Sequence, residues 1–86
     1  MAITADQLQE ASQILVASPS TRAAAAVIRE RFAPLRALVL DAMDMRGEKP
    51  AMQLGQRAIY LMATDGHCWS VTPEADKASA FVLTQD

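Results

Sequence analysis

One stretch, residues 58–72, constrains the fold of this 86-residue chain more than any other. Two apolar, strand-like runs flank the dipeptide Asp65-Gly66. This dipeptide readily takes positive φ at two successive positions, as a type I′ turn requires, and such a turn matches the twist of paired strands. The sequence therefore predicts a β-hairpin with Asp65-Gly66 as its two-residue loop. The same stretch contains the only His, Cys, Trp and Tyr of the chain.

The residues well before the hairpin follow a helical period in two segments. Thr4 and Gln7 have the spacing of a capping box, and a helix of about three to four turns is expected after them. Residues 18–21 interrupt that helix. The alanine-rich residues 22–32 predict a second helix, which packs antiparallel to the first because the connection is short. Its apolar stripe consists of Ala24, Val27, Ile28 and Phe32.

From residue 35 onward the pattern changes to runs that are typical of strands. Residues 35–45 predict a strand that becomes polar toward its end, and residues 46–50 predict a loop from their Gly, Pro and charges. Residues 53–56 then lead into the hairpin. The chain after the hairpin predicts a short helix that begins near Thr72 and a final strand over residues 80–84.

These elements predict a single α+β domain over residues 1–86. Its helical part covers about residues 4–33 and its sheet part about residues 36–84. We expect the two N-terminal helices to pack on a small antiparallel sheet of three or four strands, with a short helix before the last strand.

Composition excludes several classes of protein. Hydrophobic residues make up 51% of the chain, well away from the disordered class. A formal net charge of −2 argues against general nucleic-acid binding, which usually needs a basic surface. No apolar run approaches the roughly 20 residues of a membrane span, and the N-terminus lacks the pattern of a signal peptide. One cysteine forms no internal disulfide, so we expect a cytoplasmic protein that binds neither nucleic acid nor membranes.

The two-residue loop assigns each hairpin residue to one face of the sheet. In this register Thr64 pairs with His67 and Ala63 pairs with Cys68. His67 and Cys68 therefore point to opposite faces, and we expect them neither to share a metal ion nor to act as a nucleophile–base pair. One face carries Tyr60, Met62, Thr64, His67, Trp69 and Val71. The other face carries Ile59, Leu61, Ala63, Cys68, Ser70 and Thr72.

The covering of these two faces suggests a candidate functional surface. We expect the helices to cover the Ile59 face, because its residues are smaller and more aliphatic. The aromatic face is then partly open, and Tyr, Trp and Met are enriched at the centres of protein interfaces. The opposite assignment, with the aromatic face as the core, stays open. The candidate partner surface consists of Tyr60, Met62, His67 and Trp69.

The remaining chemical groups have simpler interpretations. Cys68 is expected to be a small buried hydrophobe, because the sequence shows no cation or helix N-terminus near it. Asp41 and Asp44 are three residues apart and would project to opposite sides of a strand, so we expect a solvated rim rather than a metal site. The chain has no phosphate loop, dinucleotide fingerprint or zinc motif. We expect no catalytic residue, no metal ligand and no cofactor.

Several short motifs in residues 35–84 suggest a family. They are Leu35-Arg36-Ala37-Leu38, Asp41 and Asp44, Ile59-Tyr60-Leu61, Asp65-Gly66, His67-Cys68, Thr72 and Val82-Leu83. In these the chain resembles a small uncharacterised proteobacterial family associated with nitrogen-fixation gene neighbourhoods. Where that family has a run of acidic residues, this chain has Asp-Ala-Met-Asp-Met, which puts an acidic role in doubt. The resemblance implies an accessory role near nitrogenase maturation or its electron supply, and it implies no catalytic residue.

The sequence thus predicts a non-enzymatic accessory or interaction protein. It would bind another protein, or a second copy of itself, through the hairpin face. One alternative is a carrier of a small ligand or metal cofactor that uses His67 with Tyr60 or the acidic loop. A weaker alternative is an enzyme with Cys68 as its nucleophile. A carrier requires a concave pocket, whereas an interaction module requires an exposed apolar patch.

Overall fold

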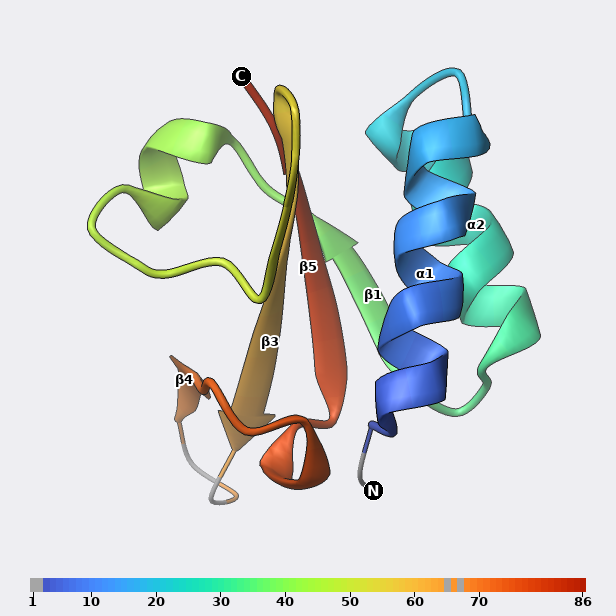
Figure 1. Ribbon diagram of the computed structural model, residues 1–86. Helices are drawn as coiled ribbons and strands as arrows, with labels where there is room; N and C mark the ends of the chain where they lie inside the picture. Colours follow the sequence, from blue (N-terminus) through green and yellow to red (C-terminus); the bar gives the residue numbers. More distant parts are fainter. Residues whose placement is uncertain (1–2, 65, 67) are drawn as a thin grey trace.

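The computed structural model describes residues 3–64, 66 and 68–86, and these form two layers. Helices α1 (Ala5–Ala17) and α2 (Thr21–Arg31) lie side by side on one face of a five-stranded sheet (Figure 1). The strands are β1 (Arg36–Val39), β2 (Met52–Leu54), β3 (Arg57–Thr64), β4 (Trp69–Val71) and β5 (Ala80–Gln85). Two 3₁₀ helices, η1 (Ala42–Met45) and η2 (Ala75–Lys77), lie in the connections. The predicted α+β class, with two N-terminal helices packed on a sheet, is confirmed.

The sheet itself differs from the prediction, because it is mixed and has more strands. The strand order is β1-β5-β3-β2. β2 and β4 lie on the same edge of β3, where β2 pairs with the first part of β3 and β4 pairs with its last part. β1 runs parallel to β5, whereas β2, β4 and β5 run antiparallel to β3. The last strand is therefore central. Its continuous apolar run, residues 80–83, is typical of a strand that is buried on both faces.

Side-chain caps begin both helices. The Gln7 amide N–H donates to Thr4 Oγ1 at 3.0 Å, and the Thr4 amide N–H donates to Gln7 Oε1 at 2.9 Å, so the predicted capping box is confirmed. Ser20 caps α2, because its Oγ accepts a hydrogen bond from the Ala23 amide at 3.1 Å. The N-terminal ends of both helices are thus specified by local contacts.

The larger core lies between the helices and the sheet. Its fully buried residues are Ile3, Ala11, Leu15, Ala24, Ala25, Ile28, Leu35, Ala37, Ile59, Leu61, Ala78, Phe81 and Leu83. The helices therefore cover the Ile59 and Leu61 face, as predicted. The stripe predicted for α2 is wrong at Val27, which is 45% exposed, because the helix turns Ala25 inward instead.

Arg57 joins the start of β3 to the end of α1. Its guanidinium Nη1 donates to the carbonyl oxygens of Leu15 at 2.6 Å and Ser18 at 2.7 Å. Nη2 donates to the Pro19 carbonyl oxygen at 3.1 Å, and Nε donates to Gln85 Oε1 at 3.2 Å. The last carbonyl groups of a helix have no partner within the helix, so Arg57 satisfies groups that α1 leaves open.

The face away from the helices carries a smaller core under η1. In Figure 1 the η1 segment (green) lies on the side of the sheet opposite α1 and α2. Met45 of η1 is buried against Ala58, Tyr60 and Val82. The strand predicted over residues 35–45 therefore ends early, because the chain turns at residues 40–41 and folds back over the sheet.

The hairpin after β3 has a longer loop than predicted. Thr64 pairs with Trp69 and Met62 pairs with Val71, so residues 65–68 form a four-residue connection. Gly66 has φ +100°, which suits glycine, whereas Asp65 lies outside the described residues. Because the register differs by two residues, each paired side chain keeps its predicted face.

A second, unpredicted hairpin joins β2 to β3. Leu54 pairs with Arg57, so Gly55 and Gln56 form a two-residue loop. Gly55 has φ +67° at the first loop position, as a type II′ turn requires. Residues 53–56 were predicted only to lead into the later hairpin.

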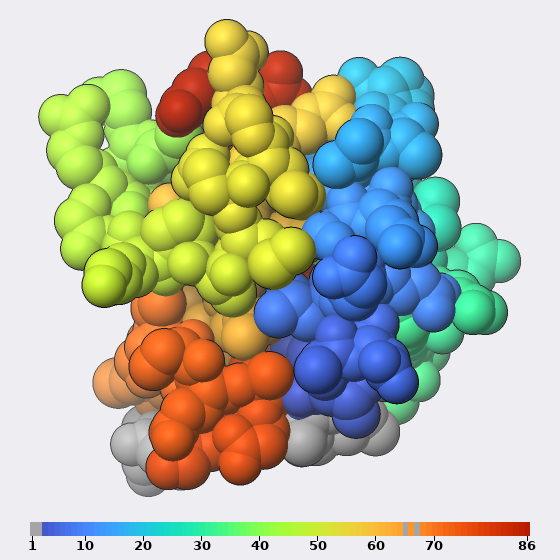
Figure 2. Space-filling view, viewed as in Figure 1, coloured from blue at the N-terminus to red at the C-terminus, as the bar shows by residue number. Residues whose placement is uncertain are grey.

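The segment between β4 and β5 contains a single 3₁₀ turn where a short helix was predicted. Thr72 Oγ1 accepts a hydrogen bond from the Glu74 amide at 3.2 Å. The Ile3 amide donates to the Ala75 carbonyl oxygen at 2.9 Å, which ties the N-terminal segment to η2. In Figure 2, α1 (blue), the β2 segment (yellow) and the η2 segment (orange) form a continuous surface. Within the described ranges, neither helix has the length and apolar character needed to cross a bilayer.

Candidate functional site

Strand pairing orders the side chains on the face away from the helices. Arg36 pairs with Ala80, Ala80 pairs with Met62, and Met62 pairs with Val71. Directly paired residues share one face, so these four form a row across β1, β5, β3 and β4. The next row consists of Leu38, Val82 and Tyr60.

Trp69 extends over the first row toward the far edge of the sheet. The guanidinium carbon of Arg36 lies 5.9 Å from the centroid of the Trp69 ring, within the range of a cation–π interaction. Arg36 and Trp69 belong to strands that are separated by β5 and β3. The small side chain of Ala80, between these strands, leaves room for the contact.

Large apolar side chains remain exposed around this contact. Trp69 is 43% exposed and Leu38 is 42% exposed, while Met62 and Val71 are half-buried. We call the set Arg36, Leu38, Met62, Trp69 and Val71 the open sheet surface. The expectation of a partly open aromatic face is therefore confirmed for the part of that face around Trp69.

The other two members of the predicted partner surface have different outcomes. Tyr60 lies on the predicted face but is only 8% exposed, because Met45 packs over it. His67 lies outside the described residues. Arg36 and Leu38 are not among the predicted residues of this surface, because only the parallel pairing of β1 with β5 brings them to it.

The expectation that Cys68 is buried is wrong. Cys68 is exposed in the connection before β4, and Ser70, not Cys68, pairs with Ala63. The longer loop removes Cys68 from the strand and hence from the covered face. A thiol reagent is therefore expected to reach Cys68 in the folded protein, contrary to the expectation from sequence.

The acidic residues after β1 also differ from the predicted geometry. Asp41 and Asp44 border and join η1 rather than a strand, and both are exposed. Among the described residues, no three His, Cys, Asp or Glu side chains gather in a way that could hold a metal ion. The geometry is that of a solvated rim.

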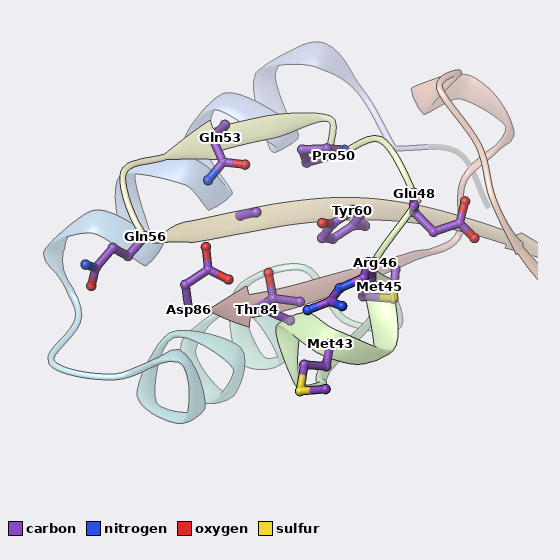
Figure 3. A pocket seen from close by; sticks show the side chains of 13 residues that line it. Met43, Met45, Arg46, Glu48, Pro50, Gln53, Gln56, Tyr60, Thr84 and Asp86 are labelled. Carbon is purple, nitrogen blue, oxygen red and sulfur yellow. The ribbon is translucent and has the colours of Figure 1, made fainter.

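A polar hollow of about 360 Å³ lies between the η1 segment and the sheet (Figure 3). Its principal side chains are Met45, Arg46, Gln53, Gln56, Ala58, Tyr60, Thr84 and Asp86. The hollow is not predicted from the sequence. The available signal was Thr84, a polar residue at the end of an otherwise apolar central strand.

The ion pairs lie on the helices and near η2, away from both features. A hydrogen bond from Arg31 lowers the pKa of the Glu10 carboxyl, and the same bond raises the pKa of Arg31. Lys77 Nζ lies 3.0 Å from Glu74 Oε2, and the hydrogen bond between them raises the pKa of Lys77. Within the described part of the chain, the cations of the two candidate sites, Arg36 and Arg46, belong to no ion pair.

Comparison of the chain with protein-family models, with curated proteins and with solved structures finds no match. The open sheet surface and the polar hollow are therefore interpreted from their own residues and geometry.

Proposed function

We propose that the protein is a non-enzymatic interaction module that binds another protein through the open sheet surface. One observation carries this proposal. Trp69 and Leu38 remain more than 40% exposed on one sheet face, whereas the central residues of the opposite face, Ile59, Leu61, Phe81 and Leu83, are fully buried. Exposed tryptophan beside arginine is typical of the residues that dominate interface energies.

The charge of the surface indicates the kind of partner. The Arg36 guanidinium lies against the Trp69 ring, and Arg29 lies beside the outer edge of β1, where its Nε donates to the Ala37 carbonyl oxygen at 2.8 Å. A complementary partner has an apolar pocket for Trp69 with carboxylates next to it. We therefore infer a partner with an acidic rim around an apolar centre.

The face of the sheet is better suited to binding than the free edge of β1. Edge strands can pair with a strand of another molecule, but this one is short and Arg29 occupies one of its carbonyl groups. Binding through side chains of the face leaves that hydrogen bond intact. The resemblance of residues 35–84 makes proteins of nitrogenase maturation or electron supply the first partners to test.

Affinity capture with matched variants tests this proposal. Trp69→Ala is compared with Val27→Ala, which shortens a side chain of similar exposure on the helical side. Circular dichroism first establishes that both variants are folded. We expect the partner to bind the wild type and Val27→Ala, and we expect Trp69→Ala to weaken binding of the purified partner by about thirtyfold or more, as for an interface hot spot.

Equal binding by all three proteins would contradict the proposal. Sedimentation of the protein alone tests the alternative that the protein associates with a second copy of itself. A dimer that Trp69→Ala abolishes would make a second copy, rather than another protein, the occupant of the open sheet surface.

A further inference from the structure

We propose that the polar hollow under η1 binds a small zwitterion of the amino-acid class, which carries one carboxylate and one ammonium group. This inference goes beyond the proposed protein interaction and concerns a different part of the same sheet face. It rests on the hydroxyl groups of two largely buried residues, unpaired within the described part of the chain, on two opposite charges and on the floor of the hollow.

The hydroxyl groups belong to Tyr60 and Thr84. Tyr60 is 8% exposed and Thr84 is 3% exposed, yet neither hydroxyl forms a hydrogen bond with another described residue. No side-chain polar atom in the described part of the chain is both sealed from solvent and unpaired, so both oxygen atoms must reach the hollow. Both hydroxyls are therefore accessible from the hollow and can exchange hydrogen bonds with a ligand there.

Opposite charges flank these hydroxyls. Figure 3 shows the Asp86 carboxylate on one side of Thr84 and the Arg46 guanidinium on the other, with the Tyr60 hydroxyl nearby. Neither Arg46 nor Asp86 forms an ion pair with a described residue. The carboxylate of Glu48 turns away from this group in the same view.

This arrangement fits a ligand with both charges. A guanidinium presents paired N–H donors to a carboxylate, and a carboxylate accepts hydrogen bonds from an ammonium group. The ligand carboxylate therefore faces Arg46 and the Tyr60 hydroxyl, and the ligand ammonium faces Asp86. Arg46 and Asp86 are both exposed to solvent, and a zwitterion pairs with both of them, whereas a simple anion or a simple amine pairs with only one.

The floor of the hollow is formed by one row of the sheet. Gln53 pairs with Ala58, and Ala58 pairs with Thr84, so the three residues share a face. Ala58 keeps the floor low because its side chain is small. The side-chain Nε2 of Gln53 donates a hydrogen bond to the Gly55 carbonyl oxygen at 2.7 Å, and this bond holds the Gln53 side chain at the rim of the hollow. The volume of about 360 Å³ is at the small end of ligand sites, which suits a ligand of amino-acid size.

Titration of the ¹⁵N-labelled protein with small molecules tests the charge requirement. The probes are L-alanine and L-glutamine. The control compounds are N-acetylalaninamide, which lacks both charges, and propionate and ethylamine, which each lack one. We expect saturable shifts at Tyr60 and Thr84 with the amino acids, and at least tenfold weaker binding of the three controls. Saturable binding of propionate or ethylamine with equal affinity, or no saturable binding of either amino acid, would overturn the proposal.

Variants then test the residues. Tyr60→Phe and Thr84→Val each remove one hydroxyl and keep the shape, and we expect binding to weaken roughly three- to tenfold. Arg46→Gln is expected to weaken it more than tenfold, because its hydrogen bonds are charge-assisted. Ser70→Ala and Arg22→Gln are controls on exposed residues away from the hollow.

The melting temperature of each variant is measured alongside, and Ala58→Leu, which fills the floor, gives an independent test that deletes no polar group. Unchanged binding in Tyr60→Phe, Thr84→Val and Ala58→Leu would place the ligand elsewhere. Trp69→Ala is expected to bind the amino acids normally, so failure of this inference is distinguishable from failure of the proposed protein interaction.

Discussion

The two faces of the sheet are built from the same strands, but different elements cover them. On one face two helices bury Ile59, Leu61, Phe81 and Leu83 completely. On the other face one short segment, η1, covers only the centre, through Met45. A regular helix presents a continuous apolar stripe, whereas a single 3₁₀ turn presents one or two side chains. The partly covered face is therefore where both candidate sites lie.

Two alanines mark the gaps in that partly covered face. Ala80 lies between Arg36 and Met62 in the row under Trp69, and Ala58 lies in the row under the polar hollow. Both are buried, and their short side chains leave space above the strands. Small residues in the sheet thus leave room for the Arg36–Trp69 contact over Ala80 and for the polar hollow over Ala58.

The largest expected effect comes from the helix-covered face. Phe81→Ala should destabilise the protein by about 3–5 kcal/mol, because it removes a fully buried ring that packs against Phe32 at a centroid distance of 6.1 Å. Such a loss approaches the whole stability expected of a small domain. Urea unfolding followed by circular dichroism measures it, with Phe81→Leu as a milder control. A loss below about 1 kcal/mol would show that this face is not the main core.

The corresponding change under η1 should cost less. Met45→Ala is expected to destabilise the protein by about 2–3 kcal/mol, because a loop segment can settle into the space more easily than a helix. Met43→Ala on the same 3₁₀ helix is the control, since Met43 is exposed and should have little effect. Equal losses for Met45→Ala and Phe81→Ala in urea unfolding would remove the contrast between the faces.

Arg57 tests how the helices are attached to their face. Arg57→Met keeps much of the side-chain bulk but deletes the hydrogen bonds to the carbonyl groups at the end of α1. We expect a loss of about 1–2 kcal/mol, since the side chain is only half-buried. Faster amide exchange in the last turn of α1 should accompany it. Arg22→Met, on an exposed residue, should change neither quantity.

Among Phe81, Met45, Arg57 and Trp69, substitution of Trp69 should have the smallest effect on stability. Trp69→Ala is expected to cost less than about 1 kcal/mol, because it removes an exposed ring and one cation–π contact. Acrylamide should quench the fluorescence of the wild-type tryptophan readily. A quencher-resistant Trp69, or a variant that unfolds, would mean that the open sheet surface is closed in solution.

The ion pair between α1 and α2 gives a weaker, pH-dependent effect. The hydrogen bond from Arg31 lowers the pKa of Glu10 in the folded state, so its stabilisation is present above the ordinary pKa of the carboxyl and is lost as the pH falls through the lowered value. The effect should shrink with added salt, because both side chains are exposed. NMR titration of the Glu10 carboxyl carbon checks this. The pKa should rise in Arg31→Gln, and an unchanged pKa would contradict the pairing.

Features that depend on near neighbours could be predicted from the sequence. Thr4 and Gln7 cap α1 through hydrogen bonds over three residues, and Gly66 supplies a positive φ within its own turn. Alternation along β3 placed Tyr60 and Ile59 on opposite faces, and a register shift of two residues left that assignment intact. Caps, turn glycines and face alternation are local, so the order of the residues is sufficient to determine them.

Features that depend on distant contacts were decided by the tertiary structure. β5 lies in the centre of the sheet because it pairs with β1, whose residues precede their partners by 44 positions (Arg36 with Ala80), and with β3. The same pairing brings Arg36 to Trp69, and the folding of η1 over the sheet buries Tyr60 and forms the polar hollow with Thr84. The order of the residues by itself predicts the two N-terminal helices and the side of a strand that each side chain takes. The strand order and the incomplete covering of one sheet face create both candidate sites. Both features depend on the free energy of packing distant segments together, and no local sequence pattern encodes that free energy.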